Sequence, residues 1–280
     1  MIKLRKPKGC RMEYRKIAVS PKRAMRLMII RPEANGSQPR TGVLWLHGGG
    51  YLTGFPEMAY MSRAIDLVTK CGAVVVSPAY RLSILHPYPA ALKDCYAALR
   101  YMKAHGEELG IRPNQIMVGG ESAGGGLAAA LCMYAKDKKE VKIAFQMPLY
   151  PMLDCEDTDS SRDNHAKVWN TRKNHIGWRL YLRRLKGRKV PAYASPARRR
   201  DYSGLPPAYT FVGDLEPFYR ETLDYVENLR KAGVEAEVDL YPGFYHAYDM
   251  MEPDTPAAQA AAARFVEKFK EAAQKYFVEE

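Results

Sequence analysis

The sequence lacks the cysteine patterns of a zinc site or a disulfide framework. Its five cysteines, an odd number, are widely scattered and form no C-x-x-C pair; they are Cys10, Cys71, Cys95, Cys132 and Cys155. Structural metal sites and disulfide-stabilised folds use closely spaced or even-numbered cysteines, so neither is expected here. Reduced thiols are typical of a cytoplasmic protein, and that location is predicted.

Long apolar runs are also missing. None approaches the roughly 20 residues that a transmembrane helix requires, so stable membrane insertion is not expected. Residues 1–8 (MIKLRKPK) are basic, but no apolar run follows them. This pattern predicts that the chain carries no secretory signal peptide.

Acidic residues are absent from one long stretch. Between Arg172 and Arg200 there is no Asp or Glu, while eleven basic residues stand at 172, 173, 179, 183, 184, 186, 188, 189, 198, 199 and 200. The whole chain has a formal net charge of +12. A run of like charge is usually a solvated surface, which is the favoured interpretation. Attraction of an anionic substrate, an acidic polymer or a membrane surface is the alternative. No recognised nucleic-acid motif accompanies the stretch, so no nucleic-acid partner is predicted.

Apolar strands alternate with helices along most of the chain. Its 280 residues suffice for one α/β domain spanning residues 1–280, and a homo-oligomer is left open. Strands are predicted at 42–46, 73–77, 116–119, 143–149, 209–212 and 238–241 after a hairpin at 12–30, with helices at 58–70, 89–105, 218–232 and from 255 onward. The alternation predicts a mainly parallel sheet with helices on both faces.

Residues 154–205 break this rhythm. They contain no strand-like run and include the basic stretch, so they are predicted to be a cap insertion above the carboxyl edge of the sheet. Trp178, Tyr181, Leu182 and Leu185 share one face of a predicted helix. That face is expected to pack over the site as a lid, and membrane binding is the alternative for a basic amphipathic helix.

A strand, a sharp turn and a helix are predicted around Ser122. The residues 119–126 read GGESAGGG, between the apolar runs 116–118 and 127–131. The G-x-S-x-G turn strains the serine backbone and lifts its hydroxyl clear of the sheet. Alone the motif is weak, and an ordinary Gly-rich turn before a helix fits it about as well.

A serine hydroxyl needs a base, and the base needs an orienting acid. In folds with this elbow the chain order is serine, acid, histidine. His246 follows a predicted strand directly and is the candidate base; His47, His86 and His105 precede the serine, and His165 and His175 lie in the insertion.

The acid is expected in the loop after the strand 209–212. Glu216 is the first choice there and Asp214 the alternative, which could instead simply support the turn. Asp249 follows His246 and breaks the order. The sequence therefore predicts a Ser122–His246–Glu216 relay.

The residues HGGG at 47–50 follow the first buried strand. Such a run lets backbone N–H groups approach the negatively charged oxygen that forms when an ester carbonyl is attacked. The predicted oxyanion hole consists of Gly48, Gly49 and Ala123, and Gly50 could substitute. His47 is interpreted as an anchor for the loop.

Together these segments resemble the hormone-sensitive-lipase-like family of α/β-hydrolase esterases. The matching segments are HGGGY (47–51), SPAYRL (77–82), HPYPAALKD (86–94), GGESAGGGLA (119–128), SGLPPAY (203–209), GDLEPF (213–218) and GFYHAYD (243–249). The resemblance implies an α/β-hydrolase fold and a serine carboxylesterase acting on short acyl esters, acetyl esters included. The expected partner is a small-molecule ester, and the chemistry needs no metal or cofactor.

The chain departs from the family pattern at three places. Glu216 stands where the family usually has Asp, and Glu121 replaces the Asp that commonly precedes the serine. The N-terminal cap is short, which predicts an accessible pocket. An amidase or formamidase with the same relay is the nearest alternative activity. A non-catalytic small-molecule receptor on this fold is a further one.

Overall fold

A computed structural model describes residues 9–33 and 38–279. The basic residues 1–8, on which the signal-peptide prediction depends, lie outside the described residues. No helix within the described ranges is long and apolar enough to cross a membrane.

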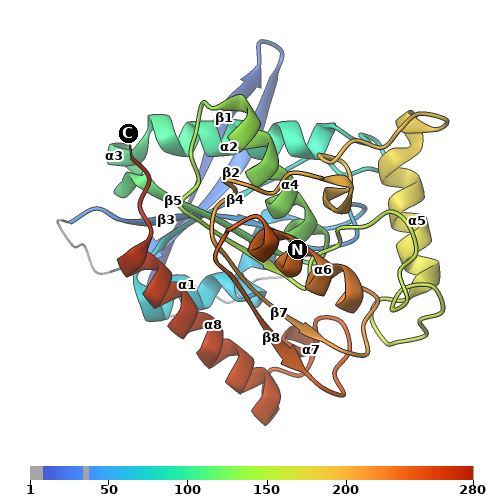
Figure 1. Ribbon diagram of the computed structural model, residues 1–280. Helices are drawn as coiled ribbons and strands as arrows, with labels where there is room; N and C mark the ends of the chain where they lie inside the picture. Colours follow the sequence, from blue (N-terminus) through green and yellow to red (C-terminus); the bar gives the residue numbers. More distant parts are fainter. Residues whose placement is uncertain (1–8, 34–37, 280) are drawn as a thin grey trace.

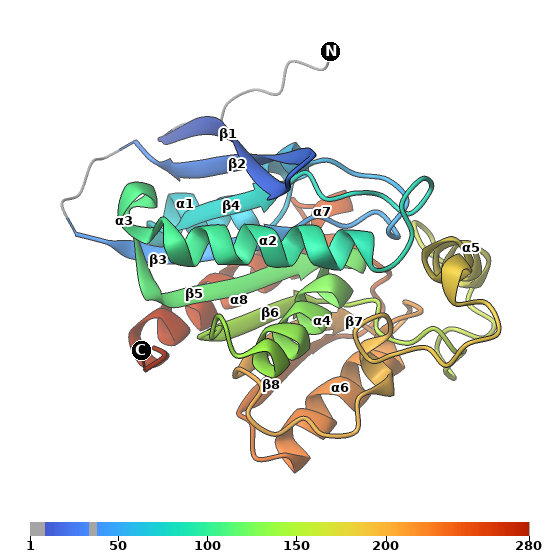
Figure 2. The ribbon, with the colours of Figure 1, turned by 90° about the horizontal axis from the view of Figure 1, so that it is seen from above.

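The strands of the described chain form one eight-stranded sheet in the order β1-β2-β4-β3-β5-β6-β7-β8 (Figures 1 and 2). The pairs β1–β2 and β2–β4 are antiparallel, and all other neighbours are parallel. The strands are β1 (Cys10–Ser20), β2 (Arg23–Pro32), β3 (Arg40–Leu46), β4 (Val74–Pro78), β5 (Ile111–Glu121), β6 (Phe145–Leu149), β7 (Ala208–Gly213) and β8 (Ala236–Tyr241). The predicted mainly parallel sheet with an edge hairpin is confirmed.

Helices cover both faces of this sheet, with α1 and α8 on one side and α2, α4 and α6 on the other (Figure 2). They are α1 (Ala64–Cys71), α2 (Ala90–Ala104), α3 (Gly106–Leu109), α4 (Ala123–Lys138), α5 (Thr171–Leu182), α6 (Tyr219–Lys231), α7 (Tyr248–Met251) and α8 (Pro256–Lys275). Short 3-10 turns are η1 (Pro56–Met61), η2 (Arg183–Leu185) and η3 (Pro196–Arg198).

The strand β3 has apolar residues at successive positions instead of alternating apolar and polar ones, because both of its faces are covered. Val43 and Trp45 belong to the core under α1 and α8, whereas Leu44 and Leu46 belong to the core under α2 and α4. Successive side chains of a strand point to opposite faces, so a strand covered on both faces must be apolar throughout.

Several predicted boundaries differ from the structure, and three of them concern the elements around the site. The helix expected at 58–70 is divided into η1 and α1, because the chain is extended at Ser62, whose hydroxyl accepts a hydrogen bond from the N–H of Ala64. Pro89 precedes the first residue of α2 instead of opening it. The strand before Ser122 is longer than predicted and begins at Ile111.

The segment 154–205 contains α5, η2 and η3 but no strand. In Figure 1 α5 stands at the margin of the molecule, away from the sheet. Trp178 and Tyr181 are buried, and Leu182 and Leu185 are partly buried. The ring of Tyr181 stacks on Tyr51 with centroids 4.0 Å apart. The apolar face of α5 therefore packs against the residue that follows the HGGG run.

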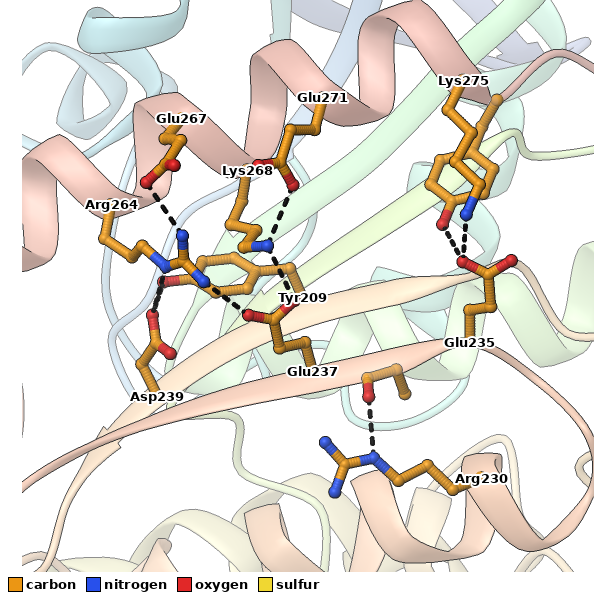
Figure 3. Close-up of polar contacts among 12 residues, drawn as sticks. Tyr209, Arg230, Glu235, Glu237, Asp239, Arg264, Glu267, Lys268, Glu271 and Lys275 are labelled. Atoms are coloured by element: carbon orange, nitrogen blue, oxygen red, sulfur yellow. Dashed lines mark hydrogen bonds and ion pairs between the residues drawn. The ribbon is translucent and has the colours of Figure 1, made fainter.

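Charged side chains of α8 form ion pairs with acidic residues of the edge strand β8 (Figure 3). Arg264 contacts Glu237 at 2.7 Å and Asp239 at 3.3 Å, and Lys268 contacts Glu237 at 2.8 Å. These pairs are largely solvated, so each contributes little to stability. Their effect is to line an exposed strand edge with charge, which disfavours pairing with another chain.

The predicted start of the last helix gives a test of local structure. The hydroxyl of Thr255 accepts a hydrogen bond of 3.3 Å from the N–H of Ala258. Thr255→Ala should lower the free energy of unfolding by about 1 kcal/mol, because that N–H loses its partner. Thr255→Ser keeps the hydroxyl and serves as the control. Chemical denaturation measures both, and equal losses in the two variants would contradict the capping role.

Candidate active site

The turn at Ser122 is sharp because the backbone of Leu46 at the end of β3 lies directly against it. Ser122 lies between β5 and α4 with φ 59° and ψ −122°, a region that side chains rarely adopt. A Cβ added to Gly124 would lie 2.0 Å from the carbonyl oxygen of Leu46, and one added to Gly120 would lie 2.4 Å from the same atom. Only glycine fits at these two positions, which is why the motif predicts the turn.

The structure brings His246 to Ser122. The imidazole Nε2 lies 2.9 Å from the Ser122 Oγ, within hydrogen-bond distance. His246 follows β8 and precedes α7, so the carboxyl end of a parallel strand carries it to the same edge as the elbow. The exposed fractions are 6% for Ser122 and 3% for His246, so both residues are almost completely buried.

Glu216 orients the other side of the imidazole. Its Oε2 lies 2.5 Å from His246 Nδ1, and its Oε1 accepts a hydrogen bond of 3.3 Å from the N–H of Gly213. Burial raises the pKa of the Glu216 carboxyl, and the neighbouring His246 opposes that rise. The result is a hydrogen-bonded series of hydroxyl, imidazole and carboxyl.

Asp214, the alternative acid, points elsewhere. Its Oδ1 accepts a hydrogen bond of 2.7 Å from the N–H of Gly243. Asp214 is exposed, whereas Glu216 is fully buried. Asp214 therefore joins the loop of the acid to the loop of the histidine, and Glu216 is the carboxylate in contact with His246.

Two aromatic rings hold the imidazole edge-on. The ring centroids of Tyr150 and Phe218 lie 5.1 Å and 5.0 Å from that of His246, nearly perpendicular to it. Such edge-to-face contacts restrict rotation of the ring. Neither residue was identified from the sequence: Tyr150 follows an apolar strand whose pattern indicates only core, and Phe218 ends the acid-loop motif without a polar group that would mark it.

His47 anchors the glycine loop, as interpreted from the sequence. Its Nδ1 lies 2.8 Å from the carbonyl oxygen of Gly48 and 3.0 Å from the hydroxyl of Tyr80, on which its ring stacks. Burial lowers the pKa of His47 to about 4, so the side chain is neutral at physiological pH. Tyr80 also donates to the carbonyl oxygen of His47 at 2.7 Å.

A second group of acids lies directly behind Ser122. Glu121 is 1% exposed, and an added Cβ on Gly48 would lie 3.5 Å from its Cγ. Burial raises the pKa of Glu121 to about 8; the indole of Trp45 and the N–H of Gly48 act against that rise, and the negative charge of Asp249 adds to it. At neutral pH the Glu121 carboxyl is thus largely protonated.

Asp249, which the predicted order excluded as the triad acid, is completely buried. It pairs with Arg63, whose Nε lies 3.3 Å from the Asp249 Oδ2. Burial raises the pKa of Asp249 to about 6, and Arg63 opposes the rise. Arg63 lies between η1 and α1, and no sequence signal identified it.

The segment 154–205 contacts the loops around the site. A Cβ on Gly50 would lie 2.2 Å from the ring of Trp169, and one on Gly177 of α5 would lie 3.2 Å from the carbonyl oxygen of Gly50. The amide of Asn164 donates to the carbonyl oxygen of Leu215 at 3.1 Å. Trp169, also missed from the sequence, therefore lies directly against the glycine loop.

The two histidines of segment 154–205, His165 and His175, lie in an exposed groove. His165 pairs with Asp163, and His175 pairs with Asp157. A cavity of about 760 Å³ lies there, lined by Asp163, Asn164, His165, Asn170, Thr171, Arg172, His175, Ile176 and Arg179. None of these residues belongs to the series Ser122–His246–Glu216. Among the described residues, no group of three or more His, Cys, Asp or Glu is arranged to hold a metal ion.

The fold and this site define an α/β hydrolase. A family model described as the alpha/beta hydrolase fold matches residues 43–250. The chain belongs to this family of enzymes, and the resemblance inferred from its motifs is confirmed.

Similar proteins bear the names of esterases. Esterase LipI of Mycobacterium tuberculosis is 33% identical over 224 residues, which cover 79% of this chain and 70% of LipI. Carboxylesterase NlhH of the same organism is 32% identical over 236 residues, covering 82% of this chain and 73% of NlhH. The solved structure of a bacterial heroin esterase superposes with a TM-score of 0.90 at 31% identity, covering 95% of this chain and 85% of the other.

The raised pKa of Glu121 predicts how stability depends on pH. In the unfolded chain this glutamate ionises near the ordinary glutamate pKa of 4.5, whereas in the folded protein it keeps its proton up to about pH 8. Its contribution to stability is therefore full below pH 4.5 and decreases as the pH rises toward 8. Glu121→Gln stays neutral and should gain stability over the wild type across that window, by an amount on the order of a few kcal/mol.

Chemical denaturation of both proteins at several values of pH between 5 and 8 measures this difference, with Glu107→Gln, an exposed substitution, as the control. If the free energy of unfolding changes with pH in the same way in the wild type and in Glu121→Gln, burial does not hold Glu121 protonated.

Proposed function

We propose that this protein is a serine carboxylesterase that hydrolyses esters of short acyl groups, acetyl esters included. The observation that carries the proposal is the hydrogen-bonded series of Ser122 Oγ, His246 Nε2, His246 Nδ1 and Glu216 Oε2, with distances of 2.9 Å and 2.5 Å. The esterase names of the similar proteins support the same reaction class.

In the first step Ser122 Oγ attacks the ester carbonyl carbon, and its proton passes to His246 Nε2. The imidazolium that forms is stabilised by Glu216, which also fixes the ring so that Nε2 faces the serine. Burial of the pair from water strengthens this interaction at the moment that charge develops.

The oxyanion of the tetrahedral intermediate is met by backbone N–H groups. We assign these to Gly48, Gly49 and Ala123. Gly50, in the same glycine loop, could substitute as a donor. Removing one such donor typically costs about 3 kcal/mol in the transition state, so the orientation of this loop matters for rate.

Collapse of the intermediate breaks the bond from the carbonyl carbon to the alkoxy oxygen. The alcohol leaves with the proton held on His246, and an acyl group remains on Ser122. Water then attacks this ester and gives its proton to His246, and the acid is released with Ser122 restored. Every proton in the cycle is carried by His246.

Restricted space near the serine supports a short acyl group. The Trp169 ring lies against Gly50, and Tyr150 and Phe218 flank His246. These bulky side chains come from three different segments. An acyl chain that lies beside them would have little room to be long. The cytoplasmic location stays a prediction of the sequence, and the oligomeric state stays open.

Replacement of the nucleophile tests the proposal. Ser122→Ala should lower kcat/KM for p-nitrophenyl acetate by at least about a thousandfold, because no other group supplies the attacking oxygen. Circular dichroism and thermal unfolding check that the variant stays folded. Matched acetyl and longer-chain esters measure the acyl preference. The corresponding amides test the amidase alternative. Undiminished turnover in the variant would exclude Ser122 as the nucleophile.

The two carboxylates of the acid loop give a matched pair of variants. Glu216→Gln should reduce kcat by roughly a thousandfold or more, since it loses the charge that stabilises the imidazolium. Asp214→Asn should reduce it less than about tenfold, because an amide oxygen can still accept the hydrogen bond from Gly243. Steady-state kinetics distinguishes them, and the reverse order of effects would assign the acid to Asp214.

A further inference from the structure

Two segments that are far apart in the sequence meet beside the active-site edge. The loop 79–88 follows β4, and residues 183–189 follow α5. The N–H of Tyr88 donates to the carbonyl oxygen of Tyr181 at 2.9 Å, and the two rings pack edge to face with centroids 5.8 Å apart. Figure 2 shows this loop next to α5, at the end of the sheet to which the strand β4 points.

The loop exposes two large apolar side chains. Ile84 is 54% exposed and Leu85 is 73% exposed, the highest exposed fraction among the large hydrophobic residues of the described chain. Leu85 precedes His86, which is also exposed. A single exposed apolar residue is ordinary, but two adjacent ones beside a group of cations offer a partner both apolar and charged contact.

The segment 183–189 exposes cations that have no acidic partner. Within the described residues, none of these side chains forms an ion pair, hydrogen bond or cation–π contact. The cations are Arg183, Arg184, Lys186, Arg188 and Lys189. By contrast, Arg198 and Arg199 of the same basic stretch pair with Asp154 and Asp137. Five of the unpaired cations of the basic stretch therefore lie in the segment that follows α5, whose Tyr181 contacts the apolar loop through Tyr88.

The interior side of α5 holds these groups in position. Trp178 and Tyr181 are buried against Tyr51. The side chains that anchor the helix and those that carry the charge thus occupy different parts of the segment. Binding to an external partner would not require the anchored face to open.

We propose that Ile84, Leu85 and the cations of residues 183–189 form a docking patch for the surface of an anionic lipid membrane. Cations attract the headgroups, and two adjacent apolar side chains enter the boundary between headgroups and acyl chains. Both kinds of group are needed for a lipid surface. A nucleic acid would use the cations alone, and Ile84 and Leu85 would have no role.

The patch would orient the bound protein. The loop 79–88 follows the carboxyl end of β4, segment 154–205 follows the carboxyl end of β6, and Ser122 follows the carboxyl end of β5. These strands are parallel members of one sheet, connected through β3. Docking through the patch therefore turns the serine-bearing edge of the sheet toward the membrane without insertion of a helix.

Cosedimentation with lipid vesicles tests this proposal independently of catalysis. The full chain is mixed with vesicles of phosphatidylcholine alone or with about one third phosphatidylglycerol, at low and at physiological salt. Binding to the anionic vesicles is expected, with little binding to the neutral ones, and it should weaken as salt screens the charges.

Two variants separate the two parts of the patch. Arg184→Gln with Arg188→Gln should weaken the partition coefficient by at least about tenfold, since each cation near an anionic surface contributes roughly a fivefold factor. Ile84→Ser with Leu85→Ser should weaken it by about tenfold through loss of the apolar contact. Thermal unfolding checks that each variant is folded.

Matched controls lie at the opposite end of the sheet. Lys103→Gln with Lys139→Gln removes two charges near the carboxyl ends of α2 and α4, and Phe277→Ser removes an apolar side chain that is 49% exposed. Both should bind as the wild type does. Absence of binding to anionic vesicles at low salt, or equal binding by all variants, would overturn the proposal. So would tight oligonucleotide binding that depends on the arginines but not on Ile84 and Leu85.

Discussion

The crowding around Ser122 is the constraint on which the site depends. Its N–H donates to the carbonyl oxygen of Leu149, and its own carbonyl oxygen accepts from the N–H groups of Gly126 and Met152, at 2.9–3.0 Å. These bonds join the elbow to β6 and to the chain after it, and they hold a backbone conformation that costs energy for a serine. Because the surrounding carbonyls leave no room for a Cβ at Gly120 or Gly124, the serine hydroxyl has one direction in which to point.

Three of the buried carboxyls at the carboxyl end of the sheet differ in their environments. Glu216 has an imidazole partner, Asp249 has Arg63, and Glu121 has only dipolar neighbours together with the repulsion of Asp249. Burial of a charge is costly unless it is paired, so these environments set different protonation states. A neutral Glu121 can sit behind the glycine loop without placing a full negative charge near the oxyanion.

Much of this arrangement follows from the order of elements in the sequence. Parallel strands bring their carboxyl ends to one edge, so a serine after β5, an acid after β7 and a histidine after β8 must face the same space. The local pattern identified these loops because glycine, proline and the strand runs mark their limits. Thr255 was likewise recognisable as a cap, since capping depends on residues only three positions apart.

Contacts between distant segments could not be predicted in this way. Glu216 and Asp214 are two residues apart, and only the path of the turn after Gly213 decides which of them reaches the imidazole. Arg63, Trp169 and Tyr150 lie in segments with no chemical motif, and Phe218 ends the acid-loop motif without a chemical role of its own. Their positions arise from how helices and loops pack. The break at Ser62 has the same origin, because the apolar spacing of residues 58–70 fits a continuous helix equally well.

The hydrogen bond from Gly243 to Asp214 has a mechanical consequence. It ties together the loops that carry the acid and the base, which also follow neighbouring strands, β7 and β8. Histidine and glutamate are therefore carried by loops that are bonded directly to each other, while the serine is carried by the separate turn between β5 and α4. A displacement of these two loops relative to β5 would separate His246 from Ser122 and leave the His246–Glu216 contact assembled.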